Sequence, residues 1–162
     1  MEQWDAYDAE FHKAAGVTLV RGGEIPEGLF HLVCDVLVEH ADGTYLVMRR
    51  APSKSFGGLW EATEGGSALA GETPLDCAVR ELREETGIRA AHLTEVGRAL
   101  SEDARAIFVE FLCRTGGEKE TVSLQPGETV DFKWVTRDEL LHMKSGKGLT
   151  KRMRQFLEET LG

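Results

Sequence analysis

Residues 29–38 constrain the fold more than any other segment of the chain. Their sequence, LFHLVCDVLV, is nearly all apolar and rich in branched side chains, a pattern typical of a strand that is buried on both faces. Such a strand lies at the centre of a sheet. Turn residues at 40–43 and a second strand-like run at 44–48 follow it, so we expect these two strands to form an antiparallel hairpin.

The length of the chain limits the number of domains. Its 162 residues give room for one hydrophobic core and not comfortably for two. We therefore expect a single domain over residues 1–162, with an N-terminal hairpin extension over about residues 1–28. Further strand-like patterns, separated by turn residues, recur at residues 93–100, 106–113 and 130–135.

Two helices are expected at the end of the chain. Thr136 and Glu139 form a capping box that opens the first helix, and Gly146 ends it. An apolar stripe marks the second helix, with Leu149, Met153, Phe156 and Leu157 as its members. The order of elements predicts the α/β class, with a mixed central sheet sandwiched between helices.

The best-marked element is a helix over residues 74–86. Thr73 is suited to the N-cap, Pro74 to the first helical position, and Asp76 stands three residues after the cap. Gly87 can adopt the left-handed conformation that ends a helix. At about 100° per residue, one side of this helix should face the core, with Leu75, Ala78, Val79, Leu82 and Thr86 on it.

Acidic side chains crowd one side of the same helix. Glu81, Glu84 and Glu85 share an arc of about 100° beside the apolar stripe. Each pair of like charges costs a few tenths of a kcal/mol when exposed, and more where water is excluded. One interpretation is a solvated acidic face neutralised by Arg80 and Arg83. The other is a partial cage of oxygen ligands for Mg²⁺, beside a glycine-rich loop, that would hold a diphosphate.

Composition and charge limit the partners. Nineteen Lys and Arg against 28 Asp and Glu give a net charge of −9, which repels nucleic acid duplexes and anionic membranes, so an anionic substrate must be met locally. We expect neither a signal peptide nor a membrane span, because no apolar run is long enough. Widely spaced cysteines favour buried thiols and a cytoplasmic location; they are Cys34, Cys77 and Cys113.

The acidic helix lies within a longer pattern. From Gly66 the chain reads GSALAGETPLDCAVRELREETGI. This segment resembles the Nudix box, written G-x5-E-x7-R-E-U-x-E-E-x-G-U with U an aliphatic residue, at every fixed position. The pattern is very specific, and it coincides with the caps and periodicity of the predicted helix. The matching residues are Gly66, Glu72, Arg80, Glu81, Leu82, Glu84, Glu85, Gly87 and Ile88.

The resemblance implies a Nudix fold, an α/β/α sandwich, and Mg²⁺-dependent hydrolysis of a diphosphate bond in a nucleoside diphosphate linked to another group. Water is the usual nucleophile in this family. Carried over by position, Glu81, Glu84 and Glu85 would bind Mg²⁺, for which Mn²⁺ would substitute. The backbone carbonyl of Gly65 or Gly66 would add a ligand. The implied partner is a small nucleotide or diphosphate, and the box does not identify which one.

The resemblance also gives two residues a supporting role. In the family, residues at the positions of Glu72 and Arg80 form an ion pair that orients the loop against the helix. The alternative for Arg80 is surface pairing with Asp76 or Glu84.

The group that deprotonates water is left open, because family members differ. A box glutamate, Glu81 or Glu84, competes with Glu128, which stands in a late loop where many relatives supply an acid. The alternative for Glu128 is an ordinary exposed loop residue. Arg49 and Lys54 are placed near the loop that faces the box, so they are candidates to bind substrate phosphates. The alternative for both is an exposed charge at a strand end.

A narrower resemblance adds two alternative functions. The opening Trp4-Asp5-Ala6-Tyr7-Asp8, the early Arg21-Gly22 segment, and the segments RRAPSKSFGGLWE and GGSALAGE together look like those of Nudix proteins related to isopentenyl diphosphate isomerase. Isomerases need a cysteine acid/base and metal-binding histidines before the box, and residues 61–66 supply neither. The second alternative is a nucleotide-binding regulator without turnover, against which the complete set of glutamates argues. The N-terminal hairpin, residues 4–20, is also a candidate contact for a homodimer.

Overall fold

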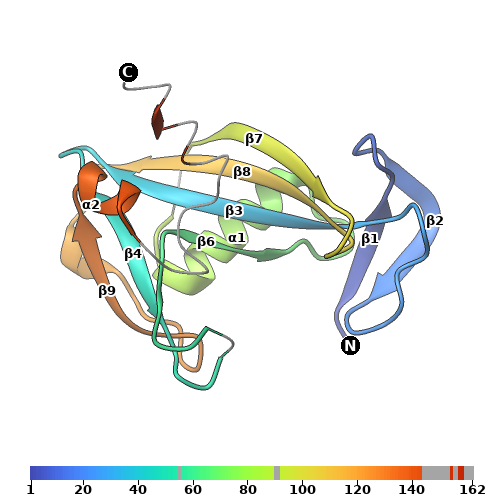
Figure 1. The fold of residues 1–162 in the computed structure, drawn as a ribbon, viewed down its shortest axis with the longest axis horizontal. Coiled ribbons are helices and arrows are strands. Elements are labelled where there is room, and N and C mark those ends of the chain that lie inside the picture. The colour runs from blue at the N-terminus through green and yellow to red at the C-terminus, as the bar shows by residue number, and fades with distance from the viewer. Residues whose placement is uncertain (55, 90–91, 144–153, 155–156, 159–162) are drawn as a thin grey trace.

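The computed structural model describes the chain except for residues 55, 90–91, 144–153, 155–156 and 159–162 (Figure 1). Two helices, α1 (Pro74–Thr86) and α2 (Arg137–Leu141), and one 3₁₀ turn (Lys119–Thr121) accompany the strands in that part of the chain. The strands are β1 (Gln3–Tyr7), β2 (Lys13–Val20), β3 (His31–His40), β4 (Tyr45–Arg50), β5 (Trp60–Glu61), β6 (Thr63–Ser67), β7 (Leu93–Ser101), β8 (Ala106–Thr115) and β9 (Thr129–Val135).

Strand β3 is the centre of a mixed sheet, as its apolar sequence predicts. It pairs in parallel with β8 along its whole length, and β8 pairs with β7. On its other edge, β3 pairs with β6 over Val33–Leu37 and meets β4 next to the turn, where Glu39 stands opposite Tyr45. The expected β3–β4 hairpin is therefore present, but β6 takes most of the edge that a longer hairpin would use.

Because β6 occupies this edge, β4 diverges from β3 and pairs instead with β5 and β9. Figure 1 shows the two strands separating from their common turn, with the loops beyond β4 and before β9 at the far end. Those loops carry two of the charged residues that the sequence singles out, Lys54 and Glu128. The divergence opens the space in which the candidate site lies.

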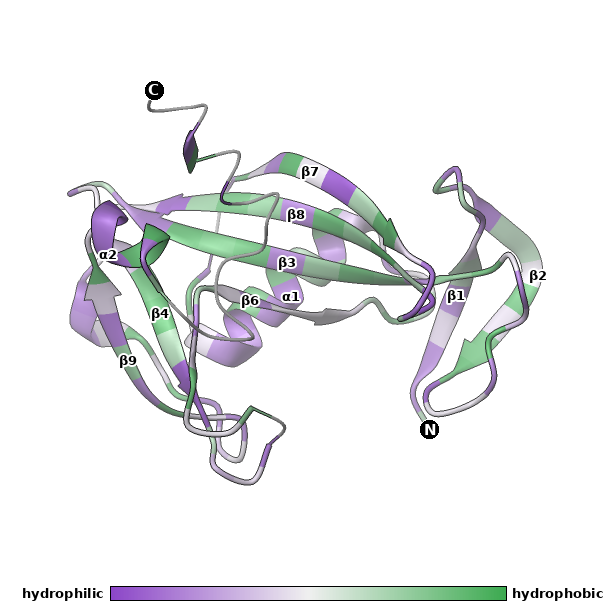
Figure 2. Cartoon of the chain, viewed as in Figure 1, coloured by the Kyte–Doolittle hydropathy of each residue, from purple (hydrophilic) through white to green (hydrophobic). Residues whose placement is uncertain are grey.

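Apolar side chains pack on both faces of the sheet. Alternate residues of β3 contact α1 on one face, where Cys34 and Val36 pack with Ala78 and Leu82. On the other face, Leu37 packs with Leu140 of α2 and with other buried side chains. Figure 2 shows the hydrophobic residues concentrated on β3, β4 and β8. The mixed sheet between helices that the sequence predicts is confirmed, and the buried cysteines Cys34, Cys77 and Cys113 are unpaired thiols.

The predicted limits of α1 are confirmed. Thr73 is the N-cap, and its hydroxyl oxygen accepts from the backbone N–H of Asp76 at 3.1 Å while the Asp76 carboxylate accepts from the N–H of Thr73 at 3.1 Å. Gly87 ends the helix in the left-handed conformation, with φ of 78°. Local sequence signals therefore fix both ends of the element that carries the acidic residues.

The predicted buried face of α1 is partly wrong. Leu75 and Val79 are 48% and 36% exposed, whereas Cys77, which the apolar stripe left out, is fully buried with Ala78, Leu82 and Thr86. The side that packs on the sheet is thus rotated toward Cys77. At about 100° per residue, Glu81 and Glu85 project between Cys77 and Ala78, so both acids leave the helix on its sheet side.

The C-terminal helices match the sequence in part. Residue Thr136 forms the predicted capping box with Glu139, but α2 ends at Leu141. Leu157, from the expected second stripe, is buried against the core that α2 covers. The remaining predicted positions, Gly146, Leu149, Met153 and Phe156, lie outside the described residues.

The N-terminal hairpin is present and lies beside the start of β3 (Figure 1). Strands β1 and β2 pair antiparallel and enclose a small cluster of their own, which includes Trp4, Ala6 and Leu19. Tyr7 forms an isolated bridge with Phe30 just before β3. In the described part of the chain, no helix has the length and apolar character to cross a membrane.

Candidate metal and diphosphate site

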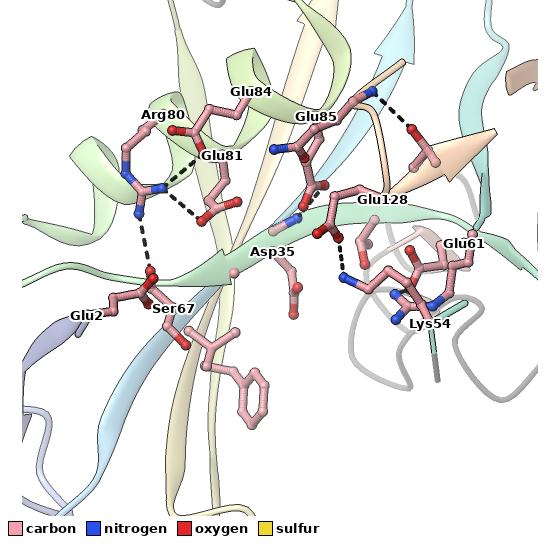
Figure 3. A pocket seen from close by; sticks show the side chains of 18 of the residues that line it. Glu2, Asp35, Lys54, Glu61, Ser67, Arg80, Glu81, Glu84, Glu85 and Glu128 are labelled. Carbon is pink, nitrogen blue, oxygen red and sulfur yellow. Dashed lines mark hydrogen bonds and ion pairs between the residues drawn. The ribbon is translucent and has the colours of Figure 1, made fainter. Parts of the chain in front are cut away.

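A cavity of about 590 Å³ opens between α1, β6 and the loops beyond β4 and before β9. Figure 3 shows Glu81 and Glu84 of α1 on one side of it and Lys54 with Glu128 on the other, with Asp35 and Glu85 between them. Most of the residues that the sequence analysis singled out line this cavity: Gly65, Gly66, Arg80, Glu81, Glu84, Glu85, Lys54 and Glu128. Segments far apart in the sequence thus converge on one site.

The expected ion pair between Glu72 and Arg80 is present. The Arg80 guanidinium donates to both carboxylate oxygens of Glu72, from Nε at 2.7 Å and from Nη2 at 2.9 Å. It also donates to the backbone oxygen of Ser67 at 3.1 Å, and the N–H of Leu69 donates to Glu72 at 2.7 Å. This paired geometry fastens the loop before α1 to the helix. The hydrogen bond to Glu72 also raises the pKa of Arg80.

Arg80 neutralises part of the acidic cluster as well. Its Nη1 lies 2.9 Å from Glu81 Oε1 and 3.2 Å from Glu84 Oε2. The alternative pairing of Arg80 with Glu84 therefore coexists with the Glu72 pair. The solvated-face interpretation fails for Glu81, whose side chain is 13% exposed, and holds only for Glu84 at 42%. Burial raises the pKa of Glu81, against the lowering effect of Arg80.

A buried acid that the sequence analysis missed, Glu64, contacts Glu85. Glu64 is 1% exposed, and its Oε1 has no hydrogen-bond partner. The Glu64 and Glu85 carboxyl groups share a hydrogen bond, and the N–H of Gly65 donates to Glu85 Oε2 at 3.2 Å. Burial raises the pKa of Glu64. Burial and the neighbouring Glu64 together raise that of Glu85.

The two glycines after Glu64 allow this close packing. A Cβ on Gly65 would lie 2.0 Å from the backbone oxygen of Cys34, and one on Gly66 would lie 2.6 Å from Glu81 Oε1. Only glycine lets β6 approach β3 on one side and the glutamates of α1 on the other. The ligand role expected for the carbonyl of Gly65 or Gly66 stays a prediction.

Lys54 and Glu128 are partners in an ion pair within the cavity. They meet because β4 and β9 pair, and the N–H of Ala51 donates to the backbone oxygen of Glu128 at 2.9 Å. Their side chains are 31% and 42% exposed, so both remain accessible to a ligand. The candidate cation and the candidate late acid of the sequence analysis thus lie at one place.

Arg49 does not line the cavity, whereas its neighbour Arg50 does. The Nε of Arg49 donates to the backbone oxygen of Gly58 at 3.0 Å, and Arg50 forms an ion pair with Glu61 at 2.7 Å. Successive side chains of a strand point to opposite faces, and the register with β9 is irregular between Arg49 and Arg50. The sequence marks the strand end correctly but does not tell which arginine faces inward.

The donor set fits a hard divalent cation. The acids on the inner side of α1 supply carboxylate oxygens, which such ions prefer, and the buried Glu64 Oε1 has no partner to offset its desolvation. Among the described residues, no three acidic, histidine or cysteine side chains already converge in a coordinating arrangement. Arg80 holds Glu81 and Glu84, while Glu85 faces Glu64, so these contacts would have to change as an ion enters.

Comparison with known proteins decides the family. The family model of the NUDIX domain matches residues 29–159. The chain belongs to the Nudix hydrolase family. It is 31% identical to an uncharacterized Nudix hydrolase, lmo0368, of Listeria monocytogenes over 90% of this chain and 86% of the relative. It is 34% identical to the uncharacterized Nudix hydrolase YfcD of Escherichia coli K12 over 69% of this chain and 62% of the relative.

Solved structures support the same fold. DR0079 from Deinococcus radiodurans has a TM-score of 0.73 at 18% identity, covering 99% of this chain and 100% of that one. The NUDIX domain of Shewanella oneidensis NrtR, complexed with ADP ribose, has a TM-score of 0.65 at 20% identity over 82% and 89% of the two chains. The Nudix fold and family inferred from the box are thus confirmed. The narrower likeness to isopentenyl diphosphate isomerase stays a prediction.

The glycine pair of this Nudix hydrolase leads to a stability prediction. We expect Gly65→Ala to lower the free energy of unfolding by about 1–3 kcal/mol, because the new methyl group meets the rigid backbone of β3. Gly66→Ala is the matched control, since its methyl group meets a side chain that can move, and it should cost less. Urea unfolding of both variants tests this, and equal losses would contradict the assignment.

The buried Glu64–Glu85 pair predicts a pH dependence for the protein in EDTA. The pKa of both groups is raised above 4.5 in the folded state, chiefly by burial. The folded protein therefore keeps protons that the unfolded chain releases. These retained protons stabilise the folded state fully below about pH 4.5. Their contribution to the free energy of unfolding is lost as the pH rises through the raised folded pKa values. The free energy of unfolding should fall as the pH rises above about 5, and the fall should continue into the alkaline range because burial raises the pKa of Glu85 more than that of Glu64.

Glu64→Gln tests this pH dependence. It removes one of the two titrating groups and should make the fall in the free energy of unfolding smaller. Glu95→Gln, at an exposed pair with Arg98, is the control and should leave the pH dependence as in the wild type. Urea titrations at several pH values measure the effect. A free energy with the same pH slope in Glu64→Gln and in the wild type would contradict the role of the buried pair.

Proposed function

We propose that this protein is a Mg²⁺-dependent hydrolase that cleaves a diphosphate bond in a nucleoside diphosphate linked to another group, with water as the nucleophile. The observation that carries the proposal is the convergence of Glu81, Glu84 and Glu85 on a cavity that also contains Lys54. An acidic protein can receive a polyanion there only if cations offset the local negative charge. Bound Mg²⁺ would do so and would lower the pKa of an attacking water.

The side chains of this chain have distinct parts in that reaction. Glu81, Glu84 and Glu85, with a backbone carbonyl of Gly65 or Gly66, would hold the metal. Arg80 and Glu72 would keep α1 and the preceding loop in register while the substrate binds. These roles depend on positioning more than on covalent chemistry, as in other phosphoryl transfers.

Lys54 and Glu128 suggest how substrate binding prepares the base. Their ion pair competes with any phosphate that approaches Lys54, because a phosphate offers the same ammonium group more negative charge. When a substrate phosphate takes the place of Glu128 beside Lys54, the Glu128 carboxylate is free to accept a proton from water. Glu81 and Glu84 remain the competing candidates for this step.

A substrate panel tests the proposed activity. The panel contains ADP-ribose, chosen because the Shewanella oneidensis NUDIX domain was solved with it, together with a sugar nucleotide, a nucleoside triphosphate, a dinucleotide and isopentenyl diphosphate. We expect hydrolysis products with Mg²⁺ and none with EDTA, and ¹⁸O-water identifies the phosphorus attacked. An allylic isomer would support the isomerase alternative, and binding without turnover would support the regulator. Either result contradicts the proposal.

Glu85→Gln tests the metal assignment. Loss of this carboxylate should lower kcat by about two orders of magnitude or more at saturating Mg²⁺. The melting temperature in EDTA should stay the same or rise, because the amide is always neutral, whereas buried Glu85 stays neutral only by keeping a proton that the unfolded chain releases. Glu95→Gln serves as the control, because Glu95 does not line the cavity and pairs with Arg98 at the surface. Near-normal turnover in Glu85→Gln would remove Glu85 from the metal site.

Glu128→Gln separates the candidates for the base. If Glu128 accepts the proton, this variant should lose turnover and still bind the substrate in a metal-dependent way, which calorimetry measures. Glu120→Gln, at an exposed acid in the 3₁₀ turn, is the control. Unaltered turnover in Glu128→Gln would move the role to Glu81 or Glu84.

A further inference from the structure

The cations that line the cavity differ in how fully they are engaged. Among the described residues they are Arg21, Arg50, Lys54 and Arg80. Arg80 is 19% exposed and makes ion pairs with acids of the box. Arg50 and Lys54 are 13% and 31% exposed, and each pairs with an acid at close range. An incoming phosphate would have to break close ion pairs at all three.

Arg21 is different from the other three. Its side chain is 66% exposed, and its ion pair runs from Nη1 to Oε2 of Glu2 at 3.3 Å. A guanidinium has five N–H donors in a planar fork. Of the cations in the described part of the cavity, Arg21 thus offers the most donor capacity to a ligand.

Contacts within the N-terminal hairpin hold Arg21 in place. Its backbone N–H donates to the backbone oxygen of Glu2 at 2.9 Å. The carboxylate of Glu2 accepts from Nε1 of Trp4 at 2.8 Å, which orients it toward Arg21. Trp4 in turn stacks on His31 at the start of β3, with ring centroids 4.2 Å apart. Glu2 and Arg21 therefore have a defined position at the cavity.

The hairpin is also fastened to the loop that precedes α1. The N–H of Ala70 donates to the backbone oxygen of Gln3 at 2.9 Å, and the N–H of Gly71 donates to the Asp5 carboxylate at 2.7 Å. The next residue is Glu72, the partner of Arg80. The hairpin and the acidic helix therefore share one anchored loop, although the NUDIX family model begins only at residue 29.

We propose that Arg21 binds a phosphate group of the substrate, so that the N-terminal hairpin forms one wall of the substrate site. Figure 3 shows Glu2, the partner of Arg21, on the side of Arg80 and Ser67, whereas Lys54 and Glu128 lie on the opposite side. Glu2 and Lys54 thus lie on two sides of the acidic cluster, and Arg21 lines the cavity as the ion-pair partner of Glu2. Glu2 holds the guanidinium until a phosphate replaces it, and the paired N–H groups of arginine match phosphate oxygens. This inference rests on the proposed function.

Arg21→Gln tests the inference with ADP and inorganic pyrophosphate as probes in the presence of Mg²⁺. Calorimetry should give a dissociation constant about tenfold or more higher than in the wild type. With a cleaved substrate from the panel, the loss should appear mainly in KM. Arg114→Gln is the matched control, because Arg114 is 68% exposed and pairs with a single acid, Glu39, away from this cavity. It should bind both probes as the wild type does.

Glu2→Gln distinguishes binding from a merely structural role. The amide keeps an acceptor for Trp4 but releases Arg21, so the probes should bind several-fold more tightly. If the Glu2–Arg21 ion pair were merely structural, Arg21→Gln and Glu2→Gln would both make the protein less stable. Both variants would then change the affinity for the probes in the same direction. In the double variant, the gain from Glu2→Gln should shrink, because Arg21 is no longer there to use it.

The outcomes separate this inference from the proposed function. If the wild type cleaves a diphosphate and Arg21→Gln behaves like Arg114→Gln, the inference is wrong and the proposed function stands. An unchanged affinity gain in the double variant would also overturn it. If the wild type neither binds nor cleaves any member of the panel, both proposals are wrong.

Discussion

The rest of the site depends on one electrostatic constraint, the burial of like-charged acids between α1 and β6. Glu81 and Glu85 leave the helix on its sheet side, and Glu64 meets Glu85 from β6. Arg80 offsets part of this charge and also connects α1 to Glu72. Burial makes unpaired carboxylates costly. A hard cation that enters this cluster would therefore stabilise the fold, and it would at the same time complete the reaction site.

The sheet provides the room for this chemistry. Strand β6 pairs with β3 and forces β4 to turn toward β9, so the loops with Lys54 and Glu128 face the acidic helix across a cavity. The glycines at 65 and 66 let β6 sit close to both neighbours. The cavity therefore follows from strand pairing, and its charged wall follows from the helix.

The sequence predicts the parts that local signals determine. The caps of α1 are set by Thr73 and Gly87, and the Glu72–Arg80 pair follows from the family pattern. Burial across the sheet is harder to predict, because it depends on how α1 rotates against β6. For that reason the apolar stripe wrongly predicts that Leu75 and Val79 are buried, and no local signal marks the buried Glu64, which directly precedes the glycine pair.

The sequence likewise does not predict the contacts between distant segments. Arg50 lines the cavity and Arg49 does not, and the register with β9 is irregular between them, which no local pattern marks. Arg21 stands outside the box and reaches the cavity through the anchoring of the hairpin near residues 70–71. For Arg49 and Arg50, the alternation of side chains along a strand predicts that only one of the two faces the cavity, but not which one.

Crystals soaked in Mn²⁺ offer the most direct measurement, because anomalous scattering locates this ion independently of the protein atoms. The account predicts a peak within about 2.0–2.5 Å of carboxylate oxygens from the cluster of Glu81, Glu84 and Glu85, with Arg80 withdrawn from at least one of them. Ordered density in which these carboxylates point into solvent, with no peak between them at saturating Mn²⁺, would contradict it.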